Sequence, residues 1–461
     1  MPMATVASSR ALPPGRLGIP IVGESWSFVT APREFVLRRV AEHGPIFRSH
    51  ILGRPTVLMA GPEALRFVLV THQKYFATGR GWPRGLRLLM DGALMMQDGD
   101  EHQRTRRAFA SAFSTPALRS YAPAIARTVS QHLARWAAGG EFRLYDATKL
   151  LMFDIASQLL LGRPFEAEVD SLSELFEDYT RGMEGLHPIL PIPVVWTPFG
   201  RALRARNKLL RHIASVLQER RDRPAKDALS LLLESGGTAG DRISDEELCR
   251  NVLFLLLAGH ESSTSLVAMA VMEFCRHPDI LEQARAEQAT FARGELSLEA
   301  IATMEILDRV VLEIERLYPP FIGAFRHVIK SFEFAGYHVP AGSQIFYCIA
   351  GTHHLDGVHA DPMRFDPTRF VRAQDKTTRQ TCALAGFGGG GHVCLGRDLA
   401  RLETKIVLAL LLRAYDVTLA PDQSLEMTFM PSIRPKSGLR ARLVSHASNC
   451  SIGAEHVAAR Q

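Results

Sequence analysis

Long hydrophobic runs are missing from this sequence of 461 residues. The richest apolar window, residues 252–258, runs into Gly259 and the polar pair His260-Glu261, so it is far shorter than the roughly 18 apolar residues of a membrane-spanning helix. The first ten residues also lack the apolar core of at least about 7 residues that a secretory signal needs. We therefore expect a cytoplasmic protein without a transmembrane segment.

Cysteine is scarce, and no two cysteines form a C-x-x-C pair among the six residues at positions 249, 275, 348, 382, 394 and 450. This spacing predicts neither a disulfide framework nor a zinc site. The net charge of +6 is diffuse and no basic cluster stands out, so nucleic acid is not expected as a partner. With 46% hydrophobic and 22% charged residues, the composition is that of an ordinary globular protein.

No internal repeat and no Gly/Ser linker divides the chain. We predict an extended, proline-rich lead-in over residues 1–25, a single domain over residues 26–445 and a flexible tail over residues 446–461. The fold class that we predict is mainly α with small β-sheets.

Hydrophobic periodicity and turn residues predict the main elements. The capping box from Ser244 to Glu247 should open a helix of roughly 32 residues that ends near Cys275. Residues 46–50 and 55–60 should form a hairpin, and residues 332–334 and 344–349 should be strands on either side of a turn at 339–342. Further helices are predicted at 32–43, over most of 100–217, at 303–317 and from near Cys394.

The densest chemical signal is the cysteine loop, residues 387–396, which contains four consecutive glycines before Cys394. Such a run is costly to order, which indicates that something must approach the backbone closely. Cys394 falls at the predicted start of a helix, where amide donors favour a thiolate. A phosphate-binding loop is excluded because no G-K-[ST] follows. The remaining alternative is a glycine-rich turn with a buried cysteine.

This loop resembles the haem-binding signature F-x-x-G-x-R-x-C-x-G of the cytochrome P-450 family, matched by Phe387, Gly390, Cys394 and Gly396. His392 departs from the arginine that is usual there. Two more motifs follow the family's order: residues 313–316 resemble its E-x-x-R helix motif, and residues 365–370 resemble the segment that supplies a second arginine to that glutamate. The resemblance implies the P-450 fold, with haem b between the long helix and the helix after the cysteine loop. It also implies that Cys394 is the thiolate ligand of the iron.

Haem carries two propionates, whose burial requires cationic donors. By resemblance, His102 and Arg106 match the family's H-x-x-x-R pair and Arg326 matches a third propionate ligand, although each alone could be a solvated side chain. Because imidazole titrates near neutral pH and arginine does not, we expect His392 to make haem retention depend on pH between about 5 and 8. The further haem-binding residues that the resemblance implies are Ala258, Gly259, Phe387, Gly388 and Gly396.

Residues 258–264, AGHESST, resemble the family's oxygen-activation motif within the long helix. The resemblance implies that Glu261 and Ser262 are catalytic: Glu261 exchanges protons with solvent, and the alcohol orients water near the bound oxygen. Ser262 replaces the usual threonine and lacks the methyl group that stiffens its rotamer, so looser coupling is expected. Ser263 or Thr264 could substitute for it. The alternative is a capped polar break in a buried helix.

Mostly apolar segments match those that the family places around its substrate, at 82–96, 188–196, 256–258, 321–325 and 429–433. The stretch from 188 to 198 is irregular and reads equally well as a lid or as a buried connector. Residues 13–15, 18–24 and 434–436 further resemble the bacterial relatives of retinoid- and terpenoid-oxidising members.

The resemblance implies a haem-thiolate monooxygenase that inserts one oxygen atom from O2 into a C–H bond of a lipophilic molecule, terpenoid- or retinoid-like. Two alternatives stay open: a non-catalytic haem protein that binds a ligand, and a peroxide-driven enzyme or isomerase of the same fold. The pair Glu261 and Ser262 disfavours the ligand-binding protein, because a binder needs no proton relay. It also disfavours the peroxide-driven enzyme or isomerase, because relatives of that kind tend to lack the acid and alcohol pair.

Nothing in the sequence resembles a flavin or nicotinamide domain, so electrons must come from a separate ferredoxin or flavodoxin with its NAD(P)H-dependent reductase. Arg397, Arg401 and Lys405, spaced by four residues, predict a basic stripe along one helix face, to which Arg104 and Arg107 add. This stripe could steer an acidic partner, although a merely solvated face is equally compatible with the spacing. We expect the protein itself to be a monomer.

Overall fold

The computed structural model describes residues 11–18, 23–162, 169–184, 191–225, 227–234, 243–291, 296–370, 381–429 and 432–446. Within these ranges the chain is mainly helical, as predicted. The α-helices are α1 (Ser25–Thr30), α2 (Pro32–His43), α3 (Pro62–Arg66), α4 (Arg84–Leu89), α5 (Gly99–Ala110), α6 (Thr115–Ala138), α7 (Leu144–Leu161), α8 (Val169–Arg181), α9 (Pro198–Asp222), α10 (Ala228–Glu234), α11 (Asp245–Arg276), α12 (Pro278–Ala289), α13 (Leu298–Ala302), α14 (Glu305–Leu317), α15 (Ile349–His353) and α17 (Arg397–Ala414).

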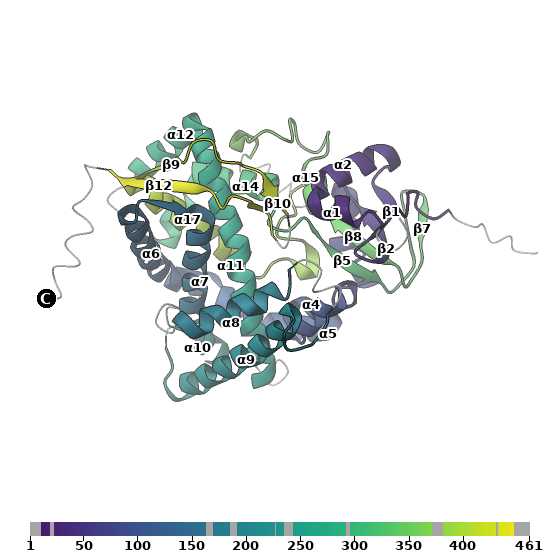
Figure 1. The fold of residues 1–461 in the computed structure, drawn as a ribbon, viewed down its shortest axis with the longest axis horizontal. Coiled ribbons are helices and arrows are strands. Elements are labelled where there is room, and N and C mark those ends of the chain that lie inside the picture. The colour runs from purple at the N-terminus through teal and green to yellow at the C-terminus, as the bar shows by residue number, and fades with distance from the viewer. Residues whose placement is uncertain are drawn as a thin grey trace, which may run out of the picture.

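The long helix α11 runs through the helical half of the molecule (Figure 1). Both bonds of its predicted capping box form: the Ser244 hydroxyl accepts from the Glu247 amide, and the Glu247 carboxylate accepts from the Ser244 amide. Helices α7, α9 and α17 pack against α11. It is long and apolar enough to cross a membrane, yet 72% of its most apolar window is buried in the fold, as expected of a core helix.

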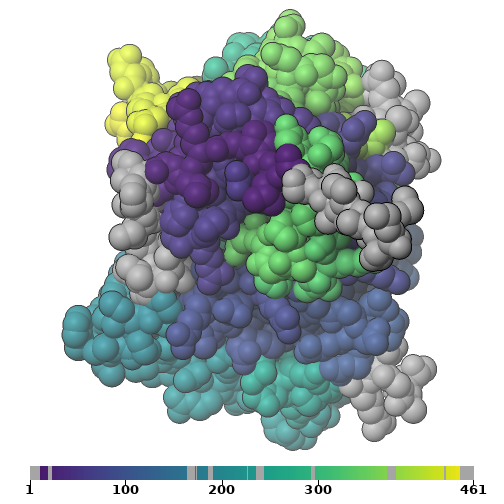
Figure 2. Space-filling model, turned by 90° about the vertical axis from the view of Figure 1, so that its right-hand side faces the viewer, coloured from purple at the N-terminus to yellow at the C-terminus, as the bar shows by residue number. Residues whose placement is uncertain are grey.

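A five-stranded sheet of order β1-β2-β8-β5-β3 forms the other half. The hairpin of β1 (Ile46–Ile51) and β2 (Arg54–Met59) pairs in parallel with β8 (Gln344–Cys348), which pairs antiparallel with β5 (Gly323–Val328). Figure 2 accordingly shows N-terminal segments beside segments from near residue 340 on one face. The remaining strands are β3 (Phe76–Ala77), β4 (Glu141–Arg143), β6 (Phe332–Phe334), β7 (Tyr337–Val339), β9 (Tyr415–Leu419), β10 (Met427–Thr428), β11 (Arg434–Pro435) and β12 (Arg440–Ser445).

Most predicted elements are confirmed. Both strands expected on either side of the 339–342 turn are present, but they belong to different sheets, because β6 pairs with β7 whereas β8 joins the larger sheet. The helix predicted over residues 303–317 is α14, which begins at Glu305, and α13 ends before it at Ala302. The last helix, predicted from near Cys394, begins at Arg397.

Candidate functional site

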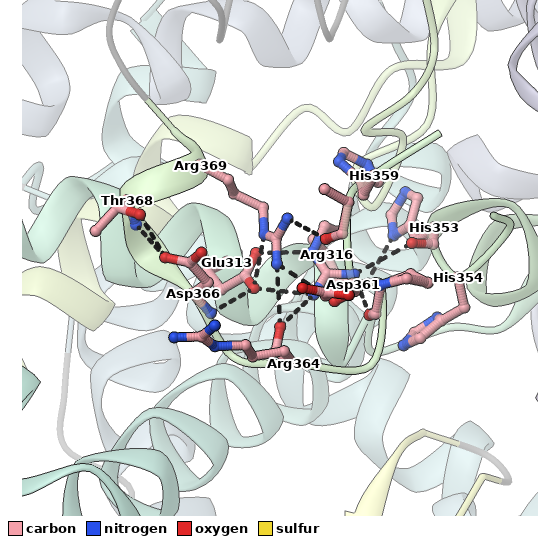
Figure 3. A network of polar contacts seen from close by, with 12 residues as sticks. Glu313, Arg316, His353, His354, His359, Asp361, Arg364, Asp366, Thr368 and Arg369 are labelled. Carbon is pink, nitrogen blue, oxygen red and sulfur yellow. Dashed lines mark hydrogen bonds and ion pairs between the residues drawn. The ribbon is translucent and has the colours of Figure 1, made fainter. Parts of the chain in front are cut away.

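A buried ion cluster ties α14 to the chain that leads into the cysteine loop (Figure 3). Arg316 binds Glu313 through two hydrogen bonds of 2.7 and 2.9 Å, and both side chains are fully buried. Arg369 donates to the same carboxylate at 3.0 Å, which confirms the second arginine expected from residues 365–370, and the Asp366 amide also donates to it, at 2.8 Å. We call this set the Glu313 cluster. One carboxylate that accepts from three donors is a structural device, since no free oxygen remains for catalysis.

His353 connects the Glu313 cluster to the cysteine loop. Its Nδ1 lies 3.0 Å from the Arg316 carbonyl, and its Nε2 accepts from the Ala385 amide at 2.9 Å. Burial, the largest cause, lowers the pKa of His353 well below its usual value, so the ring is neutral and has one donor and one acceptor nitrogen. The residues just before Phe387 are thereby attached to α14.

The glycines of the cysteine loop are explained mainly by contact with the chain segment η1 (Phe67–Thr71). Gly390 has a φ of +59°, and a Cβ there would lie 1.9 Å from the Leu69 carbonyl oxygen. Gly388 has a φ of +73°, a conformation that favours glycine. The close approach that we predicted therefore exists, but for these glycines its partner is protein backbone.

Cys394 follows this turn, and its amide donates to the Phe387 carbonyl at 2.8 Å. Protein groups surround Cys394 on nearly all sides, yet its side chain remains accessible. Burial raises the pKa of the Cys394 thiol, and the Gly396 amide and the charges of Arg106 and Arg397 offset this only partly. The predicted stabilisation by a helix terminus is thus weaker than expected, because α17 begins three residues later. A metal ion deprotonates a coordinating thiol outright, so ligation does not depend on that stabilisation.

The predicted propionate ligands converge from three separate segments. His102 on α5 is buried, and its ring centroid lies 3.9 Å from that of His392. Arg326 on β5 is also buried, packs over the Tyr347 ring and donates to its hydroxyl at 3.4 Å. Burial and the positive charges of His102, Arg326 and Arg106 lower the pKa of His392 to about 3. The protein alone therefore gives His392 no charge at neutral pH, and pH-sensitive haem retention stays a prediction.

These residues fit a haem. An accessible thiol lies in the interior, and Arg106 acts on it electrostatically. The guanidinium groups of Arg106 and Arg326 lie close enough to the imidazoles of His102 and His392 to affect their pKa values. Two propionates would therefore meet two permanent cations and two further nitrogen donors.

Two of the three hydroxyl groups in the polar run of α11 donate to backbone carbonyls of the same helix. The Ser262 hydroxyl donates to the Ala258 carbonyl at 3.0 Å and the Thr264 hydroxyl to the His260 carbonyl at 2.6 Å. Ser263 reaches Glu403 on α17 at 3.1 Å, which joins the two helices expected to flank the cofactor. A Cβ at Gly259 would meet only Ala156, at 3.9 Å, so internal packing does not require a glycine there.

Glu261 points away from Ser262 and into a cluster that the sequence reasoning missed. Lys149 on α7 binds its Oε1 at 2.7 Å, Ser432 donates to its Oε2 at 3.2 Å, and His260 Nε2 lies 3.5 Å from Oε1. Burial alone would raise the pKa of Glu261, but the nearby imidazole of His260 and the ammonium of Lys149 lower it below its usual value. One signal for Lys149 was available, since it is the only basic residue in the apolar segment 144–161.

We expect Lys149→Met to raise the pKa of Glu261, because the variant removes a cation that favours the carboxylate and leaves the burial that opposes it. The carboxyl band of Glu261, identified by its loss in Glu261→Gln, can be followed by infrared spectroscopy as the pH is lowered. Lys149→Arg keeps the charge and should titrate like the parent. Equal midpoints in Lys149→Met and the parent would show that the lysine does not control this carboxylate.

Of the expected lid, residues 188–190 lie outside the described ranges. The described part is exposed: Ile192, Val194 and Val195 show 38 to 57% of their surface, and Trp196 shows 77%. For these residues the buried connector is therefore wrong. Of the other expected substrate walls, Leu256, Leu257, Ile322 and Phe325 are buried in the core.

The predicted basic stripe is wrong as a docking surface for Arg401, Lys405 and Arg104, whereas Arg107 is exposed. Arg401 is almost buried, donates to Glu315 at 2.6 Å and packs over the Phe387 ring. Lys405 is buried and binds Asp308 at 3.1 Å. Arg104 pairs with Glu247. The spacing correctly placed residues 397, 401 and 405 on one face of α17, but that face packs toward α14, and only Arg397 is half-exposed.

Comparison with known proteins agrees with this geometry. The family model "Cytochrome P450" matches residues 13–442. The chain is 35% identical to a "Putative cytochrome P450 120" of Synechocystis sp., over 96% of this chain and 98% of that protein. It is 32% identical to "Cytochrome P450 26B1" of Xenopus tropicalis, over 95% and 88%.

Two solved structures are similar in fold. One is "Retinoic acid bound cyanobacterial CYP120A1", with a TM-score of 0.87, 35% identity, and coverage of 95% of this chain and 100% of the other. The second is the "cytochrome P450DA heme domain", with a TM-score of 0.84, 22% identity, and coverage of 94% and 97%, which supports the fold alone. With an accessible interior cysteine, a cationic set beside it and a family match over nearly its whole length, the chain belongs to the cytochrome P450 family of haem-thiolate monooxygenases.

Proposed function

We propose that the protein hydroxylates a retinoid or a similar lipophilic isoprenoid, with Cys394 as the thiolate ligand of haem b. The observation that carries the proposal is the full-length similarity to the retinoic acid-bound structure of cyanobacterial CYP120A1. When bound, a haem with thiolate ligation supplies the electron density that favours cleavage of the O–O bond. In the overall reaction, two electrons and two protons enter, one oxygen atom is inserted into the C–H bond and the other leaves as water.

The protein's own residues have three tasks in this proposal. His102, Arg106, Arg326 and His392 bind the propionates and orient the cofactor.

Lys149 and His260 hold Glu261 as a carboxylate, and Lys149, whose side chain is 36% exposed, lies where the cluster meets solvent. Glu261 then passes protons inward, and Ser262 orients water once its hydroxyl leaves the Ala258 carbonyl. Because serine lacks the methyl group that restricts the rotamer of threonine, the Ser262 hydroxyl is held less rigidly than that of a threonine would be.

Electrons reach the protein from a separate redox protein, for which we propose a ferredoxin or flavodoxin with its reductase. The surface that it uses is not the α17 stripe, because Arg401 and Lys405 are engaged in the interior.

The test is turnover of retinoic acid by the haem-loaded protein with ferredoxin, ferredoxin reductase and NADPH under ¹⁸O₂. We expect a product that carries one labelled oxygen atom, and Glu261→Gln should form less product per NADPH consumed. A non-catalytic haem protein would bind retinoic acid without product, and a peroxide-driven enzyme would need no reductase. Absence of both retinoic acid binding and product would contradict the proposal.

A further inference from the structure

A shallow, partly open groove lies between the β1–β2 hairpin, the start of α4 and strand β5. Its apolar lining comes from Ile51, Leu52, Pro83 and Phe325, and its polar lining from Arg54, Arg84 and Gln344. None of these residues holds the cofactor or moves a proton in the proposal above. The groove is too open to enclose a whole ligand, and it suits one end of an elongated one.

Two arginines without an acidic partner line this groove. Arg54 and Arg84 are exposed, and within the described part of the chain neither forms an ion pair with a carboxylate. Arg54 donates only to the neutral Gln344 Oε1, at 3.2 Å. Like charges around one groove repel each other, and a single anion placed between them removes that repulsion. The planar guanidinium group matches a carboxylate in particular.

The groove is rigidly connected to the cofactor site. Gln344 donates to the Gly81 carbonyl at 2.6 Å while it accepts from Arg54, so it joins β2 and β8 to the segment that leads into α4. A Cβ on Gly81 would lie 2.7 Å from the Arg326 Cα, which shows how closely that segment packs on β5. Phe325 lines the groove, and its neighbour Arg326 is one of the propionate ligands.

One aromatic ring, that of Phe325, lines the groove behind the charged rim. Trp82 and Phe346 hold this ring in place from outside the lining, with ring centroids 6.0 and 4.8 Å from that of Phe325. An unsaturated hydrocarbon chain packs well on such a ring. Cations at the rim and apolar side chains beneath them match a lipophilic acid better than an alcohol or a hydrocarbon.

We infer that this groove, through Arg54 and Arg84, binds the carboxylate end of a lipophilic acid substrate and so selects the acid over the corresponding alcohol. The inference rests on the proposed function for the choice of retinoic acid as probe. It adds to that function the charge of the substrate and the residues that recognise it.

The experiment is a spectral titration of the haem-loaded protein with retinoic acid and with retinol, which differ at the head group. The double variant Arg54→Gln/Arg84→Gln should lose about tenfold in affinity for the acid and keep its affinity for the alcohol. Added salt should weaken acid binding to the parent and not to the double variant. The matched control is Arg87→Gln, because Arg87 is exposed on α4 but does not line the groove.

Unchanged acid affinity in the double variant would overturn the inference, and so would an equal loss for the alcohol. If the parent binds neither retinoid, the proposed function fails instead. The same comparison with palmitate and hexadecanol then decides whether the groove recognises carboxylates.

Discussion

Cys394→Ser is expected to abolish the Soret band that a haem-thiolate protein gives with carbon monoxide after reduction. A serine hydroxyl does not supply the thiolate that this band requires. The substitution replaces one sulfur atom by oxygen in a side chain with an accessible surface, so the change should not disturb packing of the fold. The absorption spectrum and the thermal unfolding of parent and variant are the measurements.

Cys382→Ser is the matched control, since Cys382 is a buried free cysteine on the chain that leads into the same loop. This variant should keep the band. A normal band in Cys394→Ser would remove Cys394 as the ligand, and its loss in both variants would mean that the spectrum reports damage to the loop instead.

Glu313→Gln should lower the free energy of unfolding by about 3 to 5 kcal/mol, the usual cost of removing one partner from a buried ion pair. Arg316 would keep its charge at a fully buried position, and the substituted amide would accept only part of the hydrogen bonds that the carboxylate accepts. Because His353 links Arg316 to the Ala385 amide, the cysteine loop should loosen as well. Denaturant unfolding and the rate of haem loss to a scavenger measure the two effects.

Glu305→Gln on the same helix is the control. Glu305 and Arg309 form an exposed pair at 3.3 Å, and such a pair contributes about 0.3 to 0.5 kcal/mol. If Glu313→Gln were no more destabilising than Glu305→Gln, the Glu313 cluster would not stabilise the fold.

The sequence predicted those features that depend on neighbours in the chain. The capping box located the start of α11, and glycines and a cysteine at fixed spacing located the loop. The stripe on α17 shows the limit of such reasoning. A spacing of four residues places Arg401 and Lys405 on one helix face, but it cannot tell whether another helix covers that face. Here α14 does, and its Asp308 and Glu315 neutralise the two charges.

The surroundings of Glu261 were missed for the same reason. Its partners Lys149 and Ser432 come from segments that lie far before and far after it in the chain, and only tertiary packing brings them together. The strands at 332–334 and 344–348 illustrate the point for sheets. Local turn residues predicted both strands, yet β8 pairs on one side with β2, where Thr56 lies opposite Gln344, and on the other side with β5.

The strand order β1-β2-β8-β5-β3 has a consequence for biosynthesis. During translation the β1–β2 hairpin leaves the ribosome long before β8 and β5 exist, so one edge of β2 stays unpaired while most of the chain is made. Pairings between such distant segments form late and slowly. The haem site is likewise incomplete until Arg326 and Cys394 have been synthesised, because both follow His102 by more than 200 residues. Haem is therefore expected to enter a nearly finished chain, and nascent chains that stall before residue 344 should expose the β2 edge to chaperones and to aggregation.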